Sequence, residues 1–211
     1  MAQRTVTAMF DRYADAATAV DRLKTAGISD SEISIVSNDA TERTRYDVDR
    51  DTEAGTGAGM GAAAGAAVGG GVGLLAGLGL LAIPGIGPVV AAGWLASTAL
   101  GAAVGAGTGG LVGALTGAGI EEKHAHTYAE GIRRGGTLVT VRADESQVAT
   151  VSDILDDEGT IDLAEREQVW RNEGWTGRYT GEGEFGPPPA PIPGRTRDAT
   201  TRGDRVRDYS I

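Results

Sequence analysis

The sequence predicts an α+β fold made of two βαβ units that a long glycine-rich insertion separates. A strand, helix, strand pattern occurs before residue 54 and again after residue 136, and no charged residue lies between Glu53 and Glu121. Two βαβ units in series favour a ferredoxin-like sandwich, in which two helices cover one face of a four-stranded antiparallel sheet. The insertion then connects the second strand to the third as a glycine-rich helical hairpin.

The first half of the predicted domain is short and regular. Residues 5–10 alternate as a strand, and residues 33–36 form a second apolar run of strand type. Between them, residues 13–25 place Ala17, Val20 and Leu23 on one helical face, and Gly27 is a stop signal. These elements predict the first βαβ unit.

The second half repeats this order after an additional helix. Residues 120–132 predict that helix, which ends at Gly135 and Gly136. A strand over 137–142, a helix over 146–157 and a strand over 160–164 then complete the sheet. Because closure entropy grows slowly with loop length, we expect this domain to fold without the insertion.

The chain therefore divides into four segments. Pro187 to Pro193 hold five of the seven prolines, and residues 195–211 have little apolar content, so we expect a disordered tail. The predicted segments are the first half-domain (1–53), the hairpin (54–120), the additional helix with the second half-domain (121–180) and the tail (181–211).

Glycines recur every fourth residue in the insertion, which holds 22 of the 34 glycines of the chain. This spacing places them along one face of a helix, where the absence of a side chain lets two helices approach closely. We predict that the following glycines pack helices against each other: Gly57, Gly61, Gly65, Gly69, Gly73, Gly77, Gly93, Gly101, Gly105, Gly109, Gly113 and Gly117.

Two prolines and two glycines interrupt the insertion near its middle. Pro84, Gly85, Gly87 and Pro88 are residues that end helices and reverse the chain. They predict the bend of the helical hairpin, with one arm over 57–82 and the other over 89–118.

Length and lack of charge favour insertion of this hairpin into a lipid bilayer. As helices the arms would measure roughly 39 Å and 45 Å, against a hydrocarbon core of about 30 Å. Basic residues flank both ends of the insertion and none lies in the bend, which favours the bacterial inner membrane with cytoplasmic termini. The low hydropathy of alanine and glycine leaves a soluble cytoplasmic multimer, held by the same glycines, as the alternative.

Composition excludes several classes of function. The net charge of −10 argues against a nucleic-acid partner, because phosphate contacts need a basic surface. The chain has no cysteine, so disulfides, thiolate metal sites and cysteine nucleophiles are excluded. A nucleotide fingerprint such as Gly105–Gly110 lacks the strand before it and the acidic residue after it.

Two histidines and two tryptophans are the remaining candidates for chemistry. His124 and His126 stand two positions apart, which directs them away from each other on a helix, so we expect a solvated helix flank and no metal site. Trp170 and Trp175 fit either packing against the domain or an aromatic belt at a membrane, and packing is favoured. We expect no catalytic residues and no cofactor.

Several short motifs succeed one another over about residues 4–177. They are Val6–Phe10, Ala17, Leu23, Gly27, Ile33–Val36, the bend at 83–88, Tyr128–Gly131, Gly135-Gly136 and Gly174–Gly177. In this order they resemble bacterial general stress proteins of the heat-induced type with a glycine-rich hydrophobic centre. The resemblance implies a stress-inducible protein without an enzymatic activity.

These inferences lead to one expected function and one alternative. The first is a non-enzymatic general stress protein that associates with the lipid bilayer through its glycine-zipper hairpin and forms homo-oligomers there. The second is a soluble oligomeric ferredoxin-like sensor or scaffold, in which the hairpin only joins copies.

Overall fold

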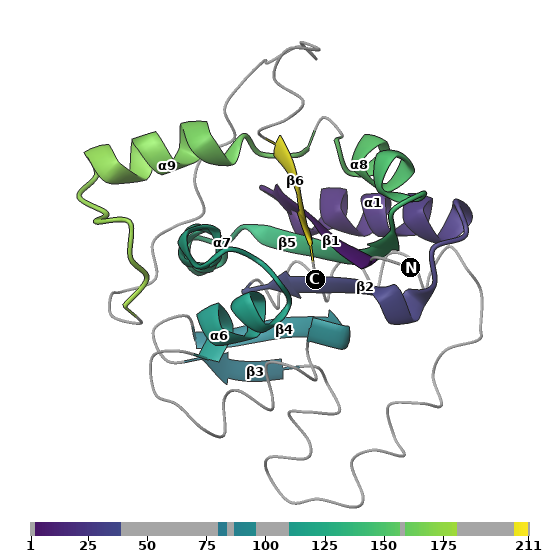
Figure 1. Cartoon of the computed structure of the whole chain (residues 1–211). Coiled ribbons are helices and arrows are strands. Elements are labelled where there is room, and N and C mark those ends of the chain that lie inside the picture. Colours follow the sequence, from purple (N-terminus) through teal and green to yellow (C-terminus); the bar gives the residue numbers. More distant parts are fainter. Residues whose placement is uncertain are drawn as a thin grey trace, which may run out of the picture.

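The computed structural model of the chain describes residues 3–38, 80–83, 87–95, 110–156, 159–180 and 205–210. They form a mixed α+β fold (Figure 1). In chain order its elements are β1 (Gln3–Phe10), α1 (Tyr13–Thr25), a 3₁₀ turn (Asp30–Glu32), β2 (Ile33–Ser37), β3 (Leu80–Ile83), β4 (Gly87–Gly93), α6 (Gly110–Gly117), α7 (Glu122–Arg133), β5 (Thr137–Asp144), α8 (Val148–Leu155), α9 (Leu163–Asn172) and β6 (Val206–Ser210).

The described strands form one six-stranded antiparallel sheet in the order β3-β4-β2-β5-β1-β6. Strand β5 lies between β1 and β2, and pairs Val141 with both Val6 and Ile33. The two strands of the first predicted βαβ unit therefore do not touch, and the second half of the chain joins them. The first βαβ unit, the additional helix, the third strand and the helix after it are confirmed as elements.

The predicted fourth strand at 160–164 is wrong. Only Thr160 bridges to Phe10, and α9 begins three residues later. Asp162 caps that helix, because its Oδ1 accepts the Glu165 N–H at 3.0 Å. This cap turns the segment into a helix before a strand can extend.

Helices cover both faces of the sheet, whereas the sequence predicted helices on one face (Figure 1). Alternation along β1 divides its side chains: Val6, Ala8 and Phe10 pack with α1 and α8, and Met9 packs with α6 and α7. Residues 5–10 are all buried as a result. The additional helix α7 thus becomes the centre of a second core layer.

The segments on both sides of the predicted bend are strands, which corrects the helical hairpin there. Leu80–Ile83 and Gly87–Gly93 form β3 and β4, which pair with each other, and β4 also pairs with β2. The open edge of β2 offers backbone partners in register, so the β-branched residues nearby adopt the strand conformation that they favour. The chain reverses at the predicted bend, but it does so as a β-hairpin.

Part of the insertion is built into the hydrophobic core. Trp94, Leu95, Leu111, Leu115 and Ala118 are buried in the cluster that contains Tyr128, Ile132 and Leu138. In addition, the Thr5 hydroxyl donates to the Ala118 carbonyl at 2.8 Å. These contacts argue against the expectation that the domain folds independently of residues 54–120.

No helix within the described ranges is both long enough and apolar enough to cross a bilayer. Residues 54–79 and 96–109, on which most of the membrane prediction depends, lie outside those ranges.

The tail also differs from its prediction where it is described. Val206–Ser210 form β6, which pairs in antiparallel register with Arg4–Ala8 of β1. Val206 and Tyr209 stand three positions apart, so the strand places one apolar side chain on each face of the sheet. The rest of the predicted disordered tail, 181–204 and 211, lies outside the described residues.

Candidate functional site

Only three of the predicted helix-packing glycines fall on described residues. Gly93 ends β4, so its helical prediction is wrong. Gly113 and Gly117 lie on α6 as predicted, but both are exposed, and a Cβ built on Gly113 would meet nothing within 4 Å. The others lie outside the described residues: Gly57, Gly61, Gly65, Gly69, Gly73, Gly77, Gly101, Gly105 and Gly109.

Two of the four predicted bend residues are described by the structure. Gly87 and Pro88 begin β4, opposite Ile83 and Ala82 of β3, whereas Pro84 and Gly85 lie outside the described residues. Pro88 can occupy this strand because β2 pairs with β4 only from Val90 onward. The missing N–H of proline therefore costs the sheet no hydrogen bond with β2.

The two histidines have protein partners, which corrects the prediction of a solvated helix flank. His126 Nδ1 accepts the Tyr179 N–H at 3.2 Å, and His124 Nδ1 lies 3.0 Å from the Tyr209 hydroxyl. Among the described residues no group of three or more possible ligands could hold a metal ion. Both histidines instead fasten later segments of the chain to α7.

A line of hydrogen bonds joins β1, α7 and β6 and ends at His124. The Thr7 hydroxyl lies 2.7 Å from the Tyr128 hydroxyl, Tyr128 is hydrogen-bonded to Tyr209, and Tyr209 reaches His124. Burial raises the pKa of both Tyr128 and Tyr209. Burial, with the nearby Arg207 charge, lowers the pKa of His124. All three side chains are therefore held in their uncharged forms near neutral pH.

Ion pairs hold β6 at its start and in its middle. The Arg205 guanidinium lies 3.0 Å from Asp156 at the end of α8, and the two side chains are only 13% and 6% exposed. Arg4 of β1 pairs with Asp208 in the middle of the strand. We call the surface that receives this strand the β1 edge, and define it by Arg4–Ala8, His124, Tyr128 and Asp156.

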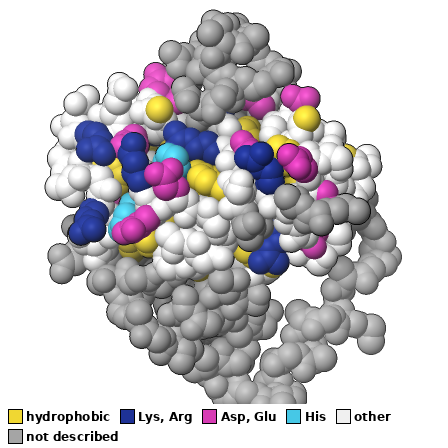
Figure 2. All heavy atoms as spheres, viewed as in Figure 1, with side chains coloured by type: hydrophobic (Ala, Val, Ile, Leu, Met, Phe, Trp, Pro, Cys, Tyr) yellow, Lys and Arg dark blue, Asp and Glu magenta, His cyan; other side chains and the backbone are white. Residues whose placement is uncertain are grey.

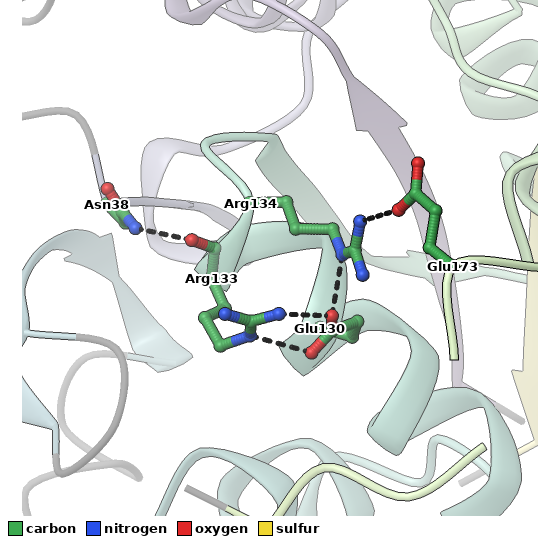
Figure 3. A network of polar contacts seen from close by, with 5 residues as sticks. All are labelled: Asn38, Glu130, Arg133, Arg134 and Glu173. Atoms are coloured by element: carbon green, nitrogen blue, oxygen red, sulfur yellow. Dashed lines mark hydrogen bonds and ion pairs between the residues drawn. The ribbon is translucent and has the colours of Figure 1, made fainter. Parts of the chain in front are cut away.

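A second polar cluster closes the C-terminal end of α7 (Figure 3). Glu130 is buried, with Arg133 Nη2 and Arg134 Nε each 2.6 Å from its Oε1 and Arg133 Nε 2.8 Å from its Oε2. The hydrogen bonds to Glu130 raise the pKa of Arg133. Arg134 also pairs with Glu173, the residue that follows α9, and Asn38 donates to the Arg133 carbonyl at 3.0 Å. The cluster links α7, α9 and the end of β2.

The two tryptophans pack against the domain, as the favoured prediction had it, with Trp170 buried and Trp175 partly buried. Trp170 of α9 is buried in the α7 layer, and its ring meets that of Trp175 edge-on at 6.0 Å. Arg134 lies over the Trp170 ring at 5.3 Å. A buried Arg166 holds α9 to the end of β1, with Asp11 at 2.7 Å.

Charged side chains of both signs alternate across the face that carries α7, α9 and β6 (Figure 2). In the two clusters just described, every acidic side chain has a basic partner: Glu130, Glu173, Asp156 and Asp208. Such closed pairs hold elements together, and they leave no carboxylate poised beside a nucleophile.

Sequence reasoning missed both clusters. The spacing of Glu130 from Arg133 and Arg134 is that of helical ion pairs and is a signal that sequence alone contains. Val206 to Tyr209 show no period-two alternation of apolar and polar residues, so the sequence holds no comparable signal for the strand there.

The comparisons with known proteins support the sequence resemblance. Residues 5–84 match the family described as the heat induced stress protein YflT domain. This part of the chain is therefore similar to a YflT stress-protein domain. No curated protein and no solved structure matches the chain.

The YflT match covers β1, α1, β2 and β3, and ends at the bend. It does not include β5, which separates β1 from β2 in the sheet. The matched segment therefore needs residues 137–144 from outside the match to complete its backbone hydrogen bonding.

Proposed function

We propose that this YflT-domain protein is a non-enzymatic stress-response protein that works by joining copies of itself through its glycine-rich insertion. The family match suggests the general stress-response role. The contact between copies and the absence of catalysis are the parts that we add.

Support for a non-enzymatic role comes from the state of the polar groups. Tyr128 is fully buried and bonded to Thr7, Glu130 is neutralised by two arginines, and both histidines have partners in the fold. A catalytic acid or nucleophile must reach a substrate, whereas these groups are occupied in holding elements together.

The observation that carries the proposal is the orientation of α6. Leu111, Ala114 and Leu115 face the core, while Gly113 and Gly117 face outward. Two glycines on an exposed helical face remove side chains where another backbone would approach, and each lowers helix stability by about 1 kcal/mol relative to alanine. In sequence they continue the four-residue spacing of Gly101, Gly105 and Gly109.

Insertion into the bacterial inner membrane is the alternative use of the same residues. It depends on the uncharged stretch between Glu53 and Glu121. In this alternative a lipid bilayer replaces water around the insertion, and the glycine contacts form within the bilayer. The described part of the insertion, with strands at 80–83 and 87–93, favours the contact between copies outside a membrane.

Sedimentation velocity on the full-length protein at micromolar concentration tests the proposal. We expect the wild-type chain to sediment as a species larger than the 21.5 kDa single copy. A variant with Gly113→Leu and Gly117→Leu should shift toward the single copy, because two branched side chains separate the helices. A wild-type protein that stays a single copy, or a variant that assembles unchanged, would count against the proposal.

A matched control separates this effect from added apolar surface. Gln168→Leu places the same side chain on an exposed position of α9 and should leave the assembly unchanged. Flotation with vesicles of phosphatidylethanolamine and phosphatidylglycerol tests the alternative. Co-flotation of the wild-type protein, but not of an unrelated soluble acidic protein, would favour insertion into the membrane.

A further inference from the structure

The edge of the sheet at β1 is filled by a strand from a distant part of the chain. Arg4, Thr5, Val6, Thr7 and Ala8 face Ser210, Tyr209, Asp208, Arg207 and Val206 in register. Nothing in a ladder of backbone hydrogen bonds requires that the added strand belong to the same molecule.

Side chains on both faces of the sheet recognise this strand. Val206 packs against the α1 and α8 core, and Tyr209 packs against the α7 core. Arg205 pairs with Asp156 and Asp208 pairs with Arg4, at the start and the middle of the segment. The contacts fix both the direction and the register of an incoming strand, since a shift of one residue would exchange its two faces.

The strand is nevertheless held less firmly than the strands at the centre. None of its five residues is fully buried, whereas residues 5–10 of β1 all are. Short segments with few buried contacts open locally at a lower free energy than the core does. Among the strands whose burial is described, β6 is therefore the one that can leave while the rest of the domain remains folded.

The connection between the domain and β6 is long enough to serve two molecules. Residues 181–204 separate Thr180 from Arg205 and include five prolines. When extended, that length of chain spans at most about 80 Å, which exceeds the width of a domain of this size. Exchange of an identical element between copies needs only such a connection and a common docking edge.

We propose that the β1 edge is a strand-docking site that receives the Arg205–Ser210 segment of a second copy, so that two copies exchange β6 reciprocally. Arg4, Asp156, Tyr128 and His124 of one copy then bind Asp208, Arg205 and Tyr209 of the other. The β1 edge has all its hydrogen-bond and ion-pair partners only when a strand with the residues of Arg205–Ser210 is bound there. The inference is independent of the glycine contact proposed above, because the two surfaces lie on different elements.

Cysteine trapping in the full-length chain tests the exchange, because the natural chain has no cysteine. Arg4 and Ser210 face each other across the β1 and β6 ladder, at a Cα separation that a disulfide can bridge. One chain would carry Arg4→Cys, and a second chain, with a tag that changes its mass, would carry Ser210→Cys. The two are mixed and left to equilibrate in a glutathione redox buffer.

We expect the mixed disulfide to exceed a collision control by about tenfold or more, because docking raises the effective concentration of the two thiols. The control pairs Ser210→Cys with Asp30→Cys, an exposed position on the 3₁₀ turn outside the β1 edge. An unlabelled peptide with the sequence of residues 205–211 should compete and lower the yield.

A single chain that carries both Arg4→Cys and Ser210→Cys completes the design. Closure of that disulfide within one chain, together with a mixed yield no higher than the control, would show that β6 stays on its own copy and would overturn the proposal. Failure of the double variant to close would overturn it as well, since the register itself would be wrong. Sedimentation of the Gly113→Leu and Gly117→Leu chain remains a separate readout.

Discussion

The hydroxyl of Thr7 lies 2.7 Å from the hydroxyl of Tyr128, in the interior between the sheet and α7. Both residues are almost fully buried, so this bond replaces water for two polar groups at once. Tyr209 joins the same bond from β6. The contact therefore ties together three elements that are far apart in sequence.

Removal of the Tyr128 hydroxyl should destabilise the protein without altering its shape. We expect Tyr128→Phe to lower the free energy of unfolding by about 1–3 kcal/mol, because the short buried bond between the Thr7 and Tyr128 hydroxyls is lost. Urea unfolding followed by circular dichroism measures the change. Thr7→Val in the same chain should then add less than it does alone, and full additivity of the two losses would contradict a direct bond.

Neutralising Glu130 should have a much larger effect than neutralising Glu173. Glu130→Gln leaves Arg133 and Arg134 without their buried carboxylate, and we expect a loss of about 3–5 kcal/mol. The matched variant Glu173→Gln removes a half-exposed partner of Arg134 and should cost about 0–1 kcal/mol. If chemical denaturation gave equal losses for the two variants, the burial of Glu130 would not contribute to the stability of the fold.

Two substitutions on α6 should act in opposite directions. Leu115→Ala leaves a cavity in the core and should cost about 2–5 kcal/mol. Gly113→Ala adds a methyl group in open space on a helix and should stabilise the fold by about 1 kcal/mol. Differential scanning calorimetry would show both as shifts in Tm. A neutral Leu115→Ala would mean that the insertion does not belong to the folding unit.

Acid should weaken the attachment of β6 through His124. Burial lowers the pKa of His124 below its value of about 6.5 in an unfolded chain, so the unfolded state takes up the proton first. The stability that it contributes is complete above about pH 7 and is lost as the pH falls through the lowered pKa. Urea midpoints between pH 5 and 8 should show this slope, and His124→Asn should make it shallower.

High pH should destabilise the fold by ionising the tyrosines whose pKa burial raises. Burial raises the pKa of Tyr179 to about 12, and those of Tyr128 and Tyr209 are raised as well. Their contribution to stability is complete below about pH 10, and declines as the pH rises toward the folded pKa. An absorbance titration of tyrosinate should show Tyr179 ionising late, and Tyr179→Phe should remove that late step. Ionisation of every tyrosine near pH 10 in the folded protein would contradict the buried environment.

The sequence alone predicted those helices and strands whose own residues show a helical or strand periodicity. Helix α1 runs from Tyr13 to Thr25 as predicted, because its small apolar residues line one face. Gly27 ends the turn after it with φ of 87°, a conformation that residues with side chains rarely adopt. The same periodicity correctly predicted strands β1, β2 and β5 and helices α7 and α8.

The sequence did not predict the elements whose structure depends on contacts with residues far away in the chain. The apolar run at Leu80–Ile83 suits a helix or a strand equally well, and its pairing with β4, which in turn pairs with β2, makes it a strand. Similarly, five residues at the end of a polar tail become β6 only because Arg4–Ala8 offer a free edge. Glu130 has the spacing of a surface ion pair, and its burial follows from the way α9 and β2 meet α7.

Thr7 and Arg207, which β1 and β6 bring together, lie 200 positions apart in the chain. A ribosome adding about 5–20 residues per second needs on the order of 10–40 s to make the residues between them. For that interval the hydrogen-bonding edge of β1 stands uncovered on a nascent chain, and an uncovered edge pairs readily with another strand. Neighbouring ribosomes on one message would hold several such edges close together, so the first meeting of two copies can precede the release of either.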